Sequence, residues 1–441
     1  MNEVASRIAI QPQWPGVKSR LASHFTTTLV AQFAILGLGA LSGVMVARLL
    51  GPEGRGEFAA LTLWPSMLVS LAAMGINQAV VFNTGRRLST LSEVWTSSTI
   101  IGLGQSILVM VVGLPVISLA LRQYSSGVRD LAFLFLAASP LVILGGYPGN
   151  LLQGILDLSS FNLIRTTAPL VYAGGIAVLF LLHRPRLREV VGFQILGYGL
   201  ALGIGYWFLF KKVPIRFAWN SGACLSLVSY GWKTQLGNVS SYVNRSADQL
   251  VLSLFVAPSE LGLYAVAVTM ATAVGLFPQA AGIVTLAAGS SSNSNETRKI
   301  ISHSFLASLF WLSIMCSLLF VLTPALIKLI FGSAFARSAT ACRILLPGAA
   351  ALGLNQVLYD GARSLGEPAL PSYAEGFATV VTFLGLWALL PRFGFIGAAV
   401  ASTLAYVSSL GLMLFLCRTK LRIGLRNLVW TSAKPTADQN I

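Results

Sequence analysis

Apolar stretches of about 20 residues alternate with short polar or basic segments along almost the whole chain. A helix of this length crosses the hydrocarbon core of a lipid bilayer. The pattern therefore predicts twelve membrane-spanning helices. The expected spans cover residues 25–49, 58–82, 94–121, 131–155, 163–182, 190–210, 225–256, 261–288, 300–322, 339–359, 372–390 and 395–417.

The segments between these stretches carry a few local signals. The residues before the first span are too many, and their apolar part begins too late, for a cleaved signal peptide, so we expect a retained tail. Pro278 lies inside the eighth span and predicts a kink there. The polar segment 289–299 predicts a flexible loop.

Composition supports a membrane protein. Hydrophobic residues make up 55% of the chain and charged residues only 10%, whereas soluble domains carry roughly 25% charged residues. The net charge of +16 does not indicate a nucleic-acid partner, because the Lys and Arg residues lie mostly between spans and in the tails. Seventeen of them fall on the side of both tails and eleven on the other side. The positive-inside rule then predicts a multi-pass inner-membrane protein with both termini in the cytoplasm.

The seventh span is polar along one side. When 225–256 is placed on a helix at 100° per residue, five residues spaced by four, three, four and three positions fall within one narrow sector. These residues, which we call the polar stripe, are Thr234, Asn238, Ser241, Arg245 and Asp248. Because a charge at the bilayer centre costs ~2.5–3.5 kcal/mol on insertion scales, the polar stripe should face protein or a wet cavity. A local pair between Arg245 and Asp248 would explain those two residues but not the other three.

Other charges near the span ends have two interpretations each. Lys233 is a candidate ligand, or its side chain extends to the inner interface. Arg48, at the end of the first span, is a candidate ligand or an anchor for lipid headgroups. Asp360 and Arg363, at the end of the tenth span, are expected to pair with each other.

A short motif recurs in the two halves of the chain. Pro52 and Gly56 follow the first span, and Pro258 and Gly262 follow the seventh span, with an aromatic residue and an Ala after each pair at the same offset. The recurrence indicates a duplication. Because each half holds an even number of spans, the halves should be related by an axis along the membrane normal, around a central cavity.

The predicted fold class is therefore an all-α integral membrane protein with twelve transmembrane helices in two six-helix bundles, related by a pseudo-two-fold along the membrane normal. The expected parts are a cytoplasmic N-terminal tail (1–24), the first bundle (25–210), a cytoplasmic linker (211–224), the second bundle (225–418) and a cytoplasmic basic tail (419–441).

Three segments resemble a known family. They are ARLLGPEGRGEFAAL (47–61), NRSADQLVLSLFVAPSELGLYAVA (244–267) and RFGFIGAAVAST (392–403). They look like the oligosaccharide and polysaccharide flippases, the Wzx-type branch of the multidrug/oligosaccharidyl-lipid/polysaccharide transporter superfamily. Asp248 falls where this family carries an acidic residue, and Arg48 where it carries a basic residue before the Leu-Gly-Pro turn.

The resemblance implies two bundles arranged as a V. It also implies export of an undecaprenyl-diphosphate-linked glycan to the periplasmic leaflet by alternating access, together with enzymes of polysaccharide biosynthesis. A proton or sodium gradient would supply the energy, and no cofactor is expected. No dedicated sodium site matches residue by residue, so the coupling ion stays open.

Such a substrate would suit the polar stripe, because its phosphorylated head cannot cross hydrocarbon and needs a wet, cationic cavity. Arg and Lys suit the phosphates, and hydroxyl or amide side chains suit the sugars. The candidate substrate ligands are Arg245, Lys233, Asn238, Ser241, Thr234 and Arg48, with Asp248 as the candidate for ion coupling.

Enzymatic and metal chemistry find little support in the sequence. The four Cys and three His residues are scattered, and no nucleophile elbow, phosphate loop or carboxylate cluster occurs, so we expect neither a metal site nor an enzyme. Two alternatives remain. A drug/cation antiporter of the same superfamily would favour acidic cavity residues, and a glycan polymerase or ligase would carry a long outer loop with catalytic Arg or His.

Overall fold

The computed structural model describes residues 17–184, 186–290 and 292–424, without the side chains at 17–26, 29, 236–238, 240, 241, 287 and 290. Within these ranges the chain folds into helices and short turns, with no strand. The helices are α1 (Val17–Ala72), α2 (Ile76–Arg86), α3 (Leu91–Ala120), α4 (Ser126–Ala137), α5 (Ser139–Gly154), α6 (Leu158–Leu181), α7 (Leu187–Lys212), α8 (Ser221–Phe255), α9 (Pro258–Thr272), η2 (Ala273–Gly275), α10 (Leu276–Ser290), α11 (Ser294–Ile330), η3 (Ser333–Phe335), α12 (Ser338–Ser364) and α13 (Ala369–Thr419).

Two of these helices contain a glycine at which the chain reverses. Gly51 in α1 (φ 69°) and Gly394 in α13 (φ 54°) adopt left-handed backbone conformations that favour glycine. In α13, a Cβ built on Gly385 would lie 2.9 Å from the Cβ of Ala401, so the segments before and after Gly394 pack side by side. Both α1 and α13 are therefore pairs of helices joined by a tight turn.

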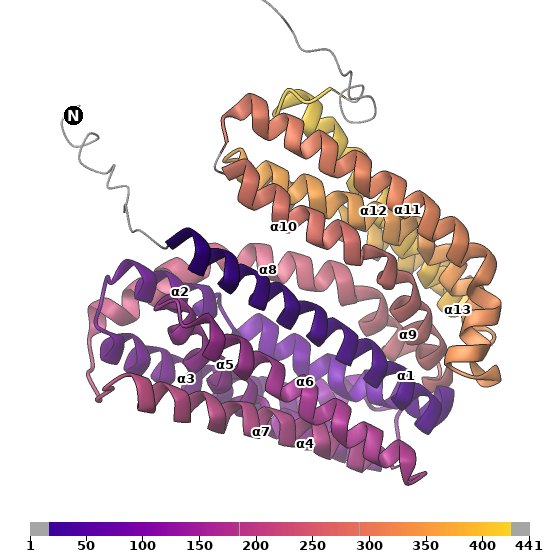
Figure 1. Ribbon diagram of the computed structural model, residues 1–441. Helices are drawn as coiled ribbons and strands as arrows, with labels where there is room; N and C mark the ends of the chain where they lie inside the picture. The colour runs from indigo at the N-terminus through magenta and orange to yellow at the C-terminus, as the bar shows by residue number, and fades with distance from the viewer. Residues whose placement is uncertain (1–16, 185, 291, 425–441) are drawn as a thin grey trace, which may run out of the picture.

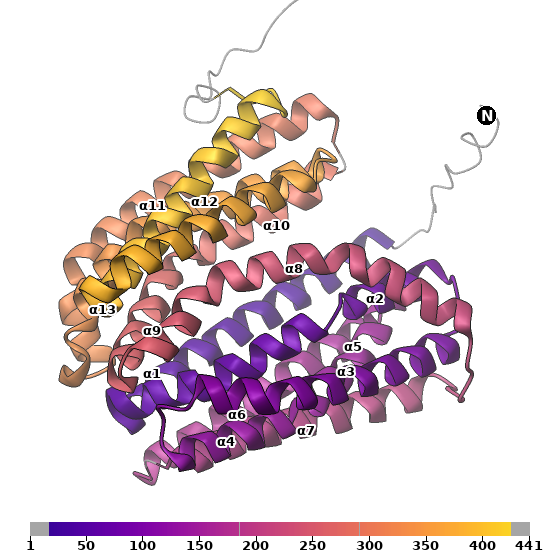
Figure 2. The same ribbon diagram turned by 180° about the vertical axis from the view of Figure 1, so that it is seen from behind.

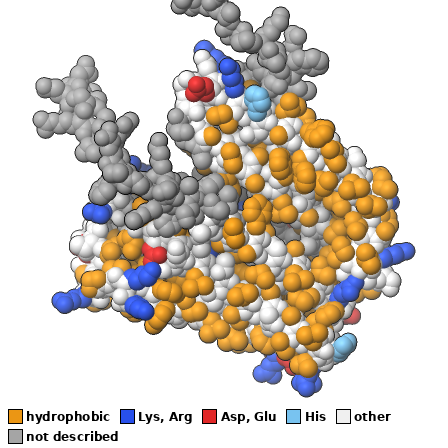
Figure 3. Space-filling view, viewed as in Figure 1, with side chains coloured by type: hydrophobic (Ala, Val, Ile, Leu, Met, Phe, Trp, Pro, Cys, Tyr) orange, Lys and Arg blue, Asp and Glu red, His pale blue; other side chains and the backbone are white. Residues whose placement is uncertain are grey.

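The helices have the length and surface of membrane spans. Among the described residues, nine helical segments are long and apolar enough to cross a membrane, and α8, which carries the polar stripe, is not one of them. Apolar side chains cover much of the face seen in Figure 3, while Lys and Arg gather near the helix ends. The prediction of an all-α, multi-pass membrane protein is thus confirmed.

Two local predictions have different outcomes. The break predicted near Pro278 is present as η2, which separates α9 from α10 three residues before the proline. The flexible loop predicted for 289–299 is wrong, because α10 extends to Ser290 and α11 already begins at Ser294. The Asn293 side chain accepts a hydrogen bond from the backbone N–H of Glu296 at 3.0 Å, so these polar residues start a helix.

The helices form two lobes that meet at one end and diverge at the other (Figures 1 and 2). The N lobe comprises α1 to α7, and the C lobe comprises α9 to α13. We call the end where they meet, near Gly51 and Gly394, the closed end. The opposite end, where the described chain begins at Val17 and α13 ends at Thr419, is the open end.

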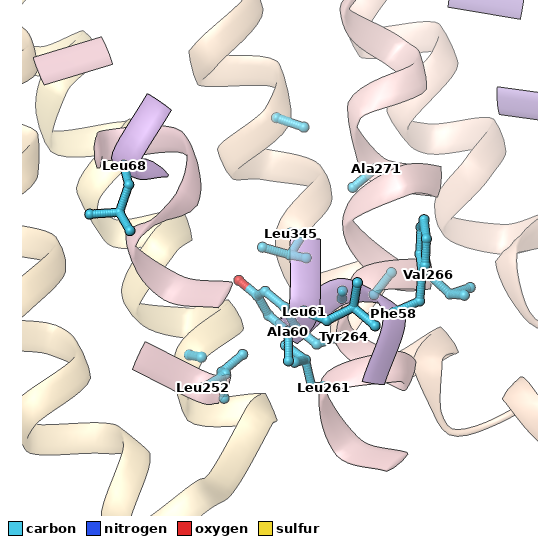
Figure 4. Packing of buried hydrophobic residues seen from close by; sticks show 14 of the residues in the cluster. Phe58, Ala60, Leu61, Leu68, Leu252, Leu261, Tyr264, Val266, Ala271 and Leu345 are labelled. Atoms are coloured by element: carbon cyan, nitrogen blue, oxygen red, sulfur yellow. The ribbon is translucent and has the colours of Figure 1, made fainter. Parts of the chain in front are cut away.

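At the closed end, α1 packs directly on α9. Figure 4 shows Phe58 and Leu61 of α1 beside Leu261 and Tyr264 of α9, and all four side chains are buried. The backbones touch at a pair of glycines. A Cβ on Gly56 would overlap the carbonyl oxygen of Pro258, and a Cβ on Gly262 would overlap the carbonyl oxygen of Pro52.

This contact is reciprocal, and its four residues are those of the recurring motif. Each Pro-to-Gly segment packs on the other in the same way, which is the relation that a local two-fold axis produces. The contact requires glycine on both sides, because any side chain would separate the backbones.

Helix α8 bridges the two lobes. In its first half, Ser226 donates a hydrogen bond to the Asn83 side chain at 2.7 Å, so this half packs on the N lobe. In its second half, Asn244 donates to the Glu375 carboxylate at 3.0 Å, and Tyr406 donates to the Asn244 carbonyl oxygen at 3.3 Å. The second half therefore packs on the C lobe, and the predicted boundaries of the two bundles stay a prediction.

Candidate functional site

A cavity of about 970 Å³ lies between the lobes. From α1 it receives mainly apolar or small residues, such as Phe33, Leu36 and Gly37. Most of its polar side chains come from α8, α10, α12 and α13. These are Tyr242, Arg245, Gln279, Gln356, Tyr359, Arg363 and Glu375. The α1 side of the cavity is thus mainly apolar, and the opposite side carries most of the polar groups, which suits an amphipathic molecule.

Arg245 and Arg363 place two positive charges in this lining, and Glu375 places one negative charge. Arg363 donates to the carboxylate of Asp360 at 2.9 Å, which confirms the local pair predicted for the end of the tenth span. Asp360 is buried and also accepts a hydrogen bond from Gln356 at 2.8 Å. The Arg363 guanidinium is held in place by this pair, but the Arg363 side chain is 44% exposed and can still meet a ligand.

Asp248 lies away from the cavity lining. It is only 4% exposed and accepts hydrogen bonds from the hydroxyl of Tyr264 at 2.5 Å and that of Ser402 at 2.8 Å. Both partners belong to the interior of the C lobe. The ion pairs between described residues do not include Asp248. The alternative of a local Arg245–Asp248 pair is therefore wrong. The Asp248 carboxylate is held by two hydroxyl groups instead.

The remaining residues of the polar stripe are only partly visible. Thr234 donates to the Gly231 carbonyl oxygen at 2.9 Å and lies against Gly75 of the N lobe. The side chains of Asn238 and Ser241 lie outside the described part of the chain. Lys233 is exposed and is not among the residues that line the cavity.

Arg48 lies at the closed end, away from the cavity. Its Nε donates to the carbonyl oxygen of Ile330 at 2.6 Å, and its Nη2 donates to that of Leu329. These are carbonyl groups of the last turn of α11, which have no partner within their own helix. Arg48 therefore connects the N lobe to the C lobe, and a role in binding substrate stays a prediction.

A family model described as polysaccharide biosynthesis protein matches residues 45–340. The chain belongs to this family. The match includes α8 with its polar stripe and most of the N lobe, and it confirms the resemblance that the three sequence segments indicated.

Two archaeal proteins are related to this chain. An uncharacterised membrane protein of Methanocaldococcus jannaschii is 23% identical over 420 residues, which cover 89% of this chain and 81% of the relative. A probable low-salt glycan biosynthesis flippase of Haloferax volcanii is 24% identical over 185 residues, which cover 41% of this chain and 39% of the relative.

Two solved structures share the fold. An inward-facing multidrug resistance MATE family transporter of the MOP superfamily aligns with a TM-score of 0.76 at 15% identity, over 88% of this chain and 94% of the other. The lipid II flippase MurJ, in an inward closed conformation, aligns with a TM-score of 0.74 at 17% identity, over 91% of this chain and 90% of the other. At these identities the likeness concerns the fold.

Several residues at the site cannot be recognised from the polar stripe or from the family resemblance alone. Glu375 is a carboxylate inside an apolar run, a signal that marks functional positions in membrane helices. Tyr264 and Ser402 lie in two of the segments that carry the family resemblance, but nothing in their spacing connects them to Asp248. Among the described residues, no group of three or more His, Cys, Asp or Glu side chains could hold a metal ion.

Proposed function

We propose that this protein is a secondary transporter, a flippase that moves a lipid-linked oligosaccharide from the cytoplasmic to the periplasmic leaflet by alternating access. The observation that carries the proposal is the cavity between the lobes, which is mainly apolar on the α1 side and bears Arg245 and Arg363 on the opposite side. An undecaprenyl-diphosphate-linked glycan has a matching division into an apolar tail and a polar, doubly phosphorylated head.

The cavity offers suitable chemistry for each part of that head. Guanidinium groups bind phosphate oxygens in a bidentate manner, and Arg363 is already oriented by Asp360. Gln279, Gln356 and Tyr359 can exchange hydrogen bonds with sugar hydroxyl groups. The tail would remain in lipid or against the mainly apolar α1 side of the cavity, so only the head has to leave water. On α8, Lys233, Thr234, Asn238 and Ser241 remain candidate ligands from the polar stripe and its vicinity.

We infer a layout of twelve spans in two six-helix bundles, related by a pseudo-two-fold along the membrane normal. The reversals at Gly51 and Gly394 support it, because each divides one long helix into two. The open end would face the cytoplasm of an inner-membrane protein with both termini inside. Its basic residues, which include Arg86, Arg87, Lys211 and Lys212, favour that orientation.

The energy would come from a proton or sodium gradient rather than from a cofactor. Asp248 is the proposed coupling carboxylate, since it is buried and held by Tyr264 and Ser402. Enzymes of polysaccharide biosynthesis would supply the substrate and use it after transport.

The test is an export assay in cells and in vesicles. Replacing Arg245→Ala or Arg363→Ala should abolish appearance of the lipid-linked glycan in the outer leaflet, while insertion and abundance remain unchanged. Lys299→Ala, at an exposed position outside the cavity, is the matched control. Normal export by both cavity variants would refute the proposal.

A drug/cation antiporter is the second candidate, because Glu375 places a carboxylate in the cavity lining. The same vesicles distinguish the two functions. Uptake of a cationic dye that depends on Glu375, without movement of lipid-linked glycan, would favour the antiporter.

A further inference from the structure

A second cavity, of about 730 Å³, lies on the C lobe at the closed end. It is a groove between the end of α8, the start of α9 and the segment of α13 that leads up to the reversal at Gly394, where these helices converge (Figure 2). Phe255, Phe383 and Trp387 border it and are 71%, 48% and 81% exposed. In a membrane protein such exposed aromatic residues face lipid, and Trp is typical of the interface.

The length of the groove along α13 matches the thickness of the hydrocarbon region of one lipid leaflet. Along α13 it extends from Phe383 to Gly394, a rise of about 16 Å for a helix. Half of the hydrocarbon core of a bilayer is about 15 Å thick. The groove begins at the turn between α8 and α9, where the chain reaches the membrane surface, so a lipid chain can enter it from its own leaflet.

One ionisable residue lines this otherwise apolar groove. Glu260, in the first turn of α9, points its carboxylate toward Gly394, where a Cβ would lie 3.4 Å from Oε2. Glu260 takes part in none of the ion pairs between described residues. An acidic residue in the first turn of a helix interacts favourably with the helix dipole, which explains why Glu260 stands in the first turn of α9. The dipole does not explain why the Glu260 carboxylate lies at an apolar groove.

We propose that this groove binds an acyl chain of a membrane lipid whose headgroup carries a primary ammonium, and that the ammonium donates hydrogen bonds to Glu260. Charge complementarity selects this lipid. The ammonium of a zwitterionic headgroup matches the Glu260 carboxylate, and the exposed Arg392, two positions before Gly394 in the chain, offers a cation for its phosphate near the same reversal. The diphosphate of a glycan carrier would place two negative groups beside Glu260. The inference requires only that the chain lies in a membrane and does not depend on the proposed transport.

The test uses the full-length protein in vesicles of phosphatidylethanolamine and phosphatidylglycerol with identical acyl chains. Native mass spectrometry after extraction should show phosphatidylethanolamine retained over phosphatidylglycerol by about tenfold, the effect of one charge-assisted hydrogen bond. A photoreactive acyl chain should label the peptide that contains Phe383 and Leu386.

Variants and competing lipids test whether the Glu260 carboxylate and the headgroup ammonium cause the preference. Glu260→Gln should remove the preference, whereas Glu53→Gln, an exposed carboxylate at the closed end of the N lobe, should keep it. Phosphatidylcholine, which has no N–H donor, should compete poorly even with the unmodified protein. Equal retention of the two lipids by the unmodified protein, labelling elsewhere, or displacement by an isoprenyl phosphate would each overturn the proposal.

Discussion

The guanidinium of Arg48 in α1 donates a hydrogen bond to the carbonyl oxygen of Ile330 in α11, across the boundary between the lobes. A positive charge at the carboxyl end of a helix also interacts favourably with the helix dipole. In the alternating access proposed above, α1 and α11 separate when the closed end opens, and the last carbonyl groups of α11 lose this partner. The contact thus stabilises the conformation that is closed at this end.

Removing the Arg48 side chain should shift the protein toward opening at the closed end. Hydrogen bonds to a charged group contribute about 1.5–3 kcal/mol, so Arg48→Ala should raise the open population about tenfold or more. Spin labels at Glu53 and Ser333, which are exposed on the two lobes, would report the distance between them. Arg48→Lys should have a smaller effect because lysine lacks the forked donor geometry. Identical distance distributions for all three proteins would contradict this role.

The reciprocal glycine contact makes a second prediction. Gly56→Ala or Gly262→Ala should prevent α1 and α9 from packing, because the added methyl group overlaps a backbone carbonyl. We expect a loss of at least 1–3 kcal/mol, as is usual for overpacking, measured as a lower melting temperature. Gly43→Ala, where nothing lies within 4 Å of the new methyl group, is the control. Unchanged stability of both variants would show that the backbones do not touch in the protein.

Replacing Asp248 should distinguish a role in ion coupling from a role in stabilising the fold. In Asp248→Asn the charge is lost, but the hydroxyl groups of Tyr264 and Ser402 can accept as well as donate hydrogen bonds, so we expect the fold to persist. Gradient-driven accumulation should be lost, while exchange of substrate at equal concentrations should continue. If accumulation survives in this variant, Asp248 does not carry the coupling ion, and Glu375 becomes the next carboxylate to replace.

Asp157, in the turn between α5 and α6, should make the stability of the protein depend on pH. Burial raises the pKa of Asp157, but hydrogen bonds from Lys212 and Ser160 outweigh it, and the pKa lies below its usual value. A carboxylate with a depressed pKa in the folded state stabilises the protein above its unfolded pKa of about 3.9, and this contribution is lost as the pH falls through the folded pKa. The melting temperature should therefore fall below about pH 5 more steeply than in Asp157→Asn. Parallel curves would exclude a contribution from this pair.

The sequence predicts the helices well, because apolar length and turn residues are local signals. It predicts the direction of each polar side chain less well. Arg245 and Asp248 are three positions apart, which leaves their directions about 60° apart around the helix. Because α8 lies between a cavity and the C lobe, this difference suffices to place Arg245 in the cavity lining and Asp248 beside Tyr264.

The spacing of polar and apolar residues along one helix cannot predict contacts between segments that are distant in the sequence. The hydrogen bond from Ser402 to Asp248 joins residues 154 positions apart, and no spacing rule connects them. The pair of Asp360 and Arg363 could be predicted because both residues lie on one turn of one helix.

The mutual packing of Gly56 and Gly262 has the form of an isologous interface, in which one surface patch meets its own copy. Such self-complementary patches are the hallmark of homodimers. A half-sized ancestral polypeptide that dimerised through this patch would yield the present arrangement once its gene was duplicated and fused. The covalent linkage would then free each copy to specialise, one retaining the apolar lining and the other acquiring the charges.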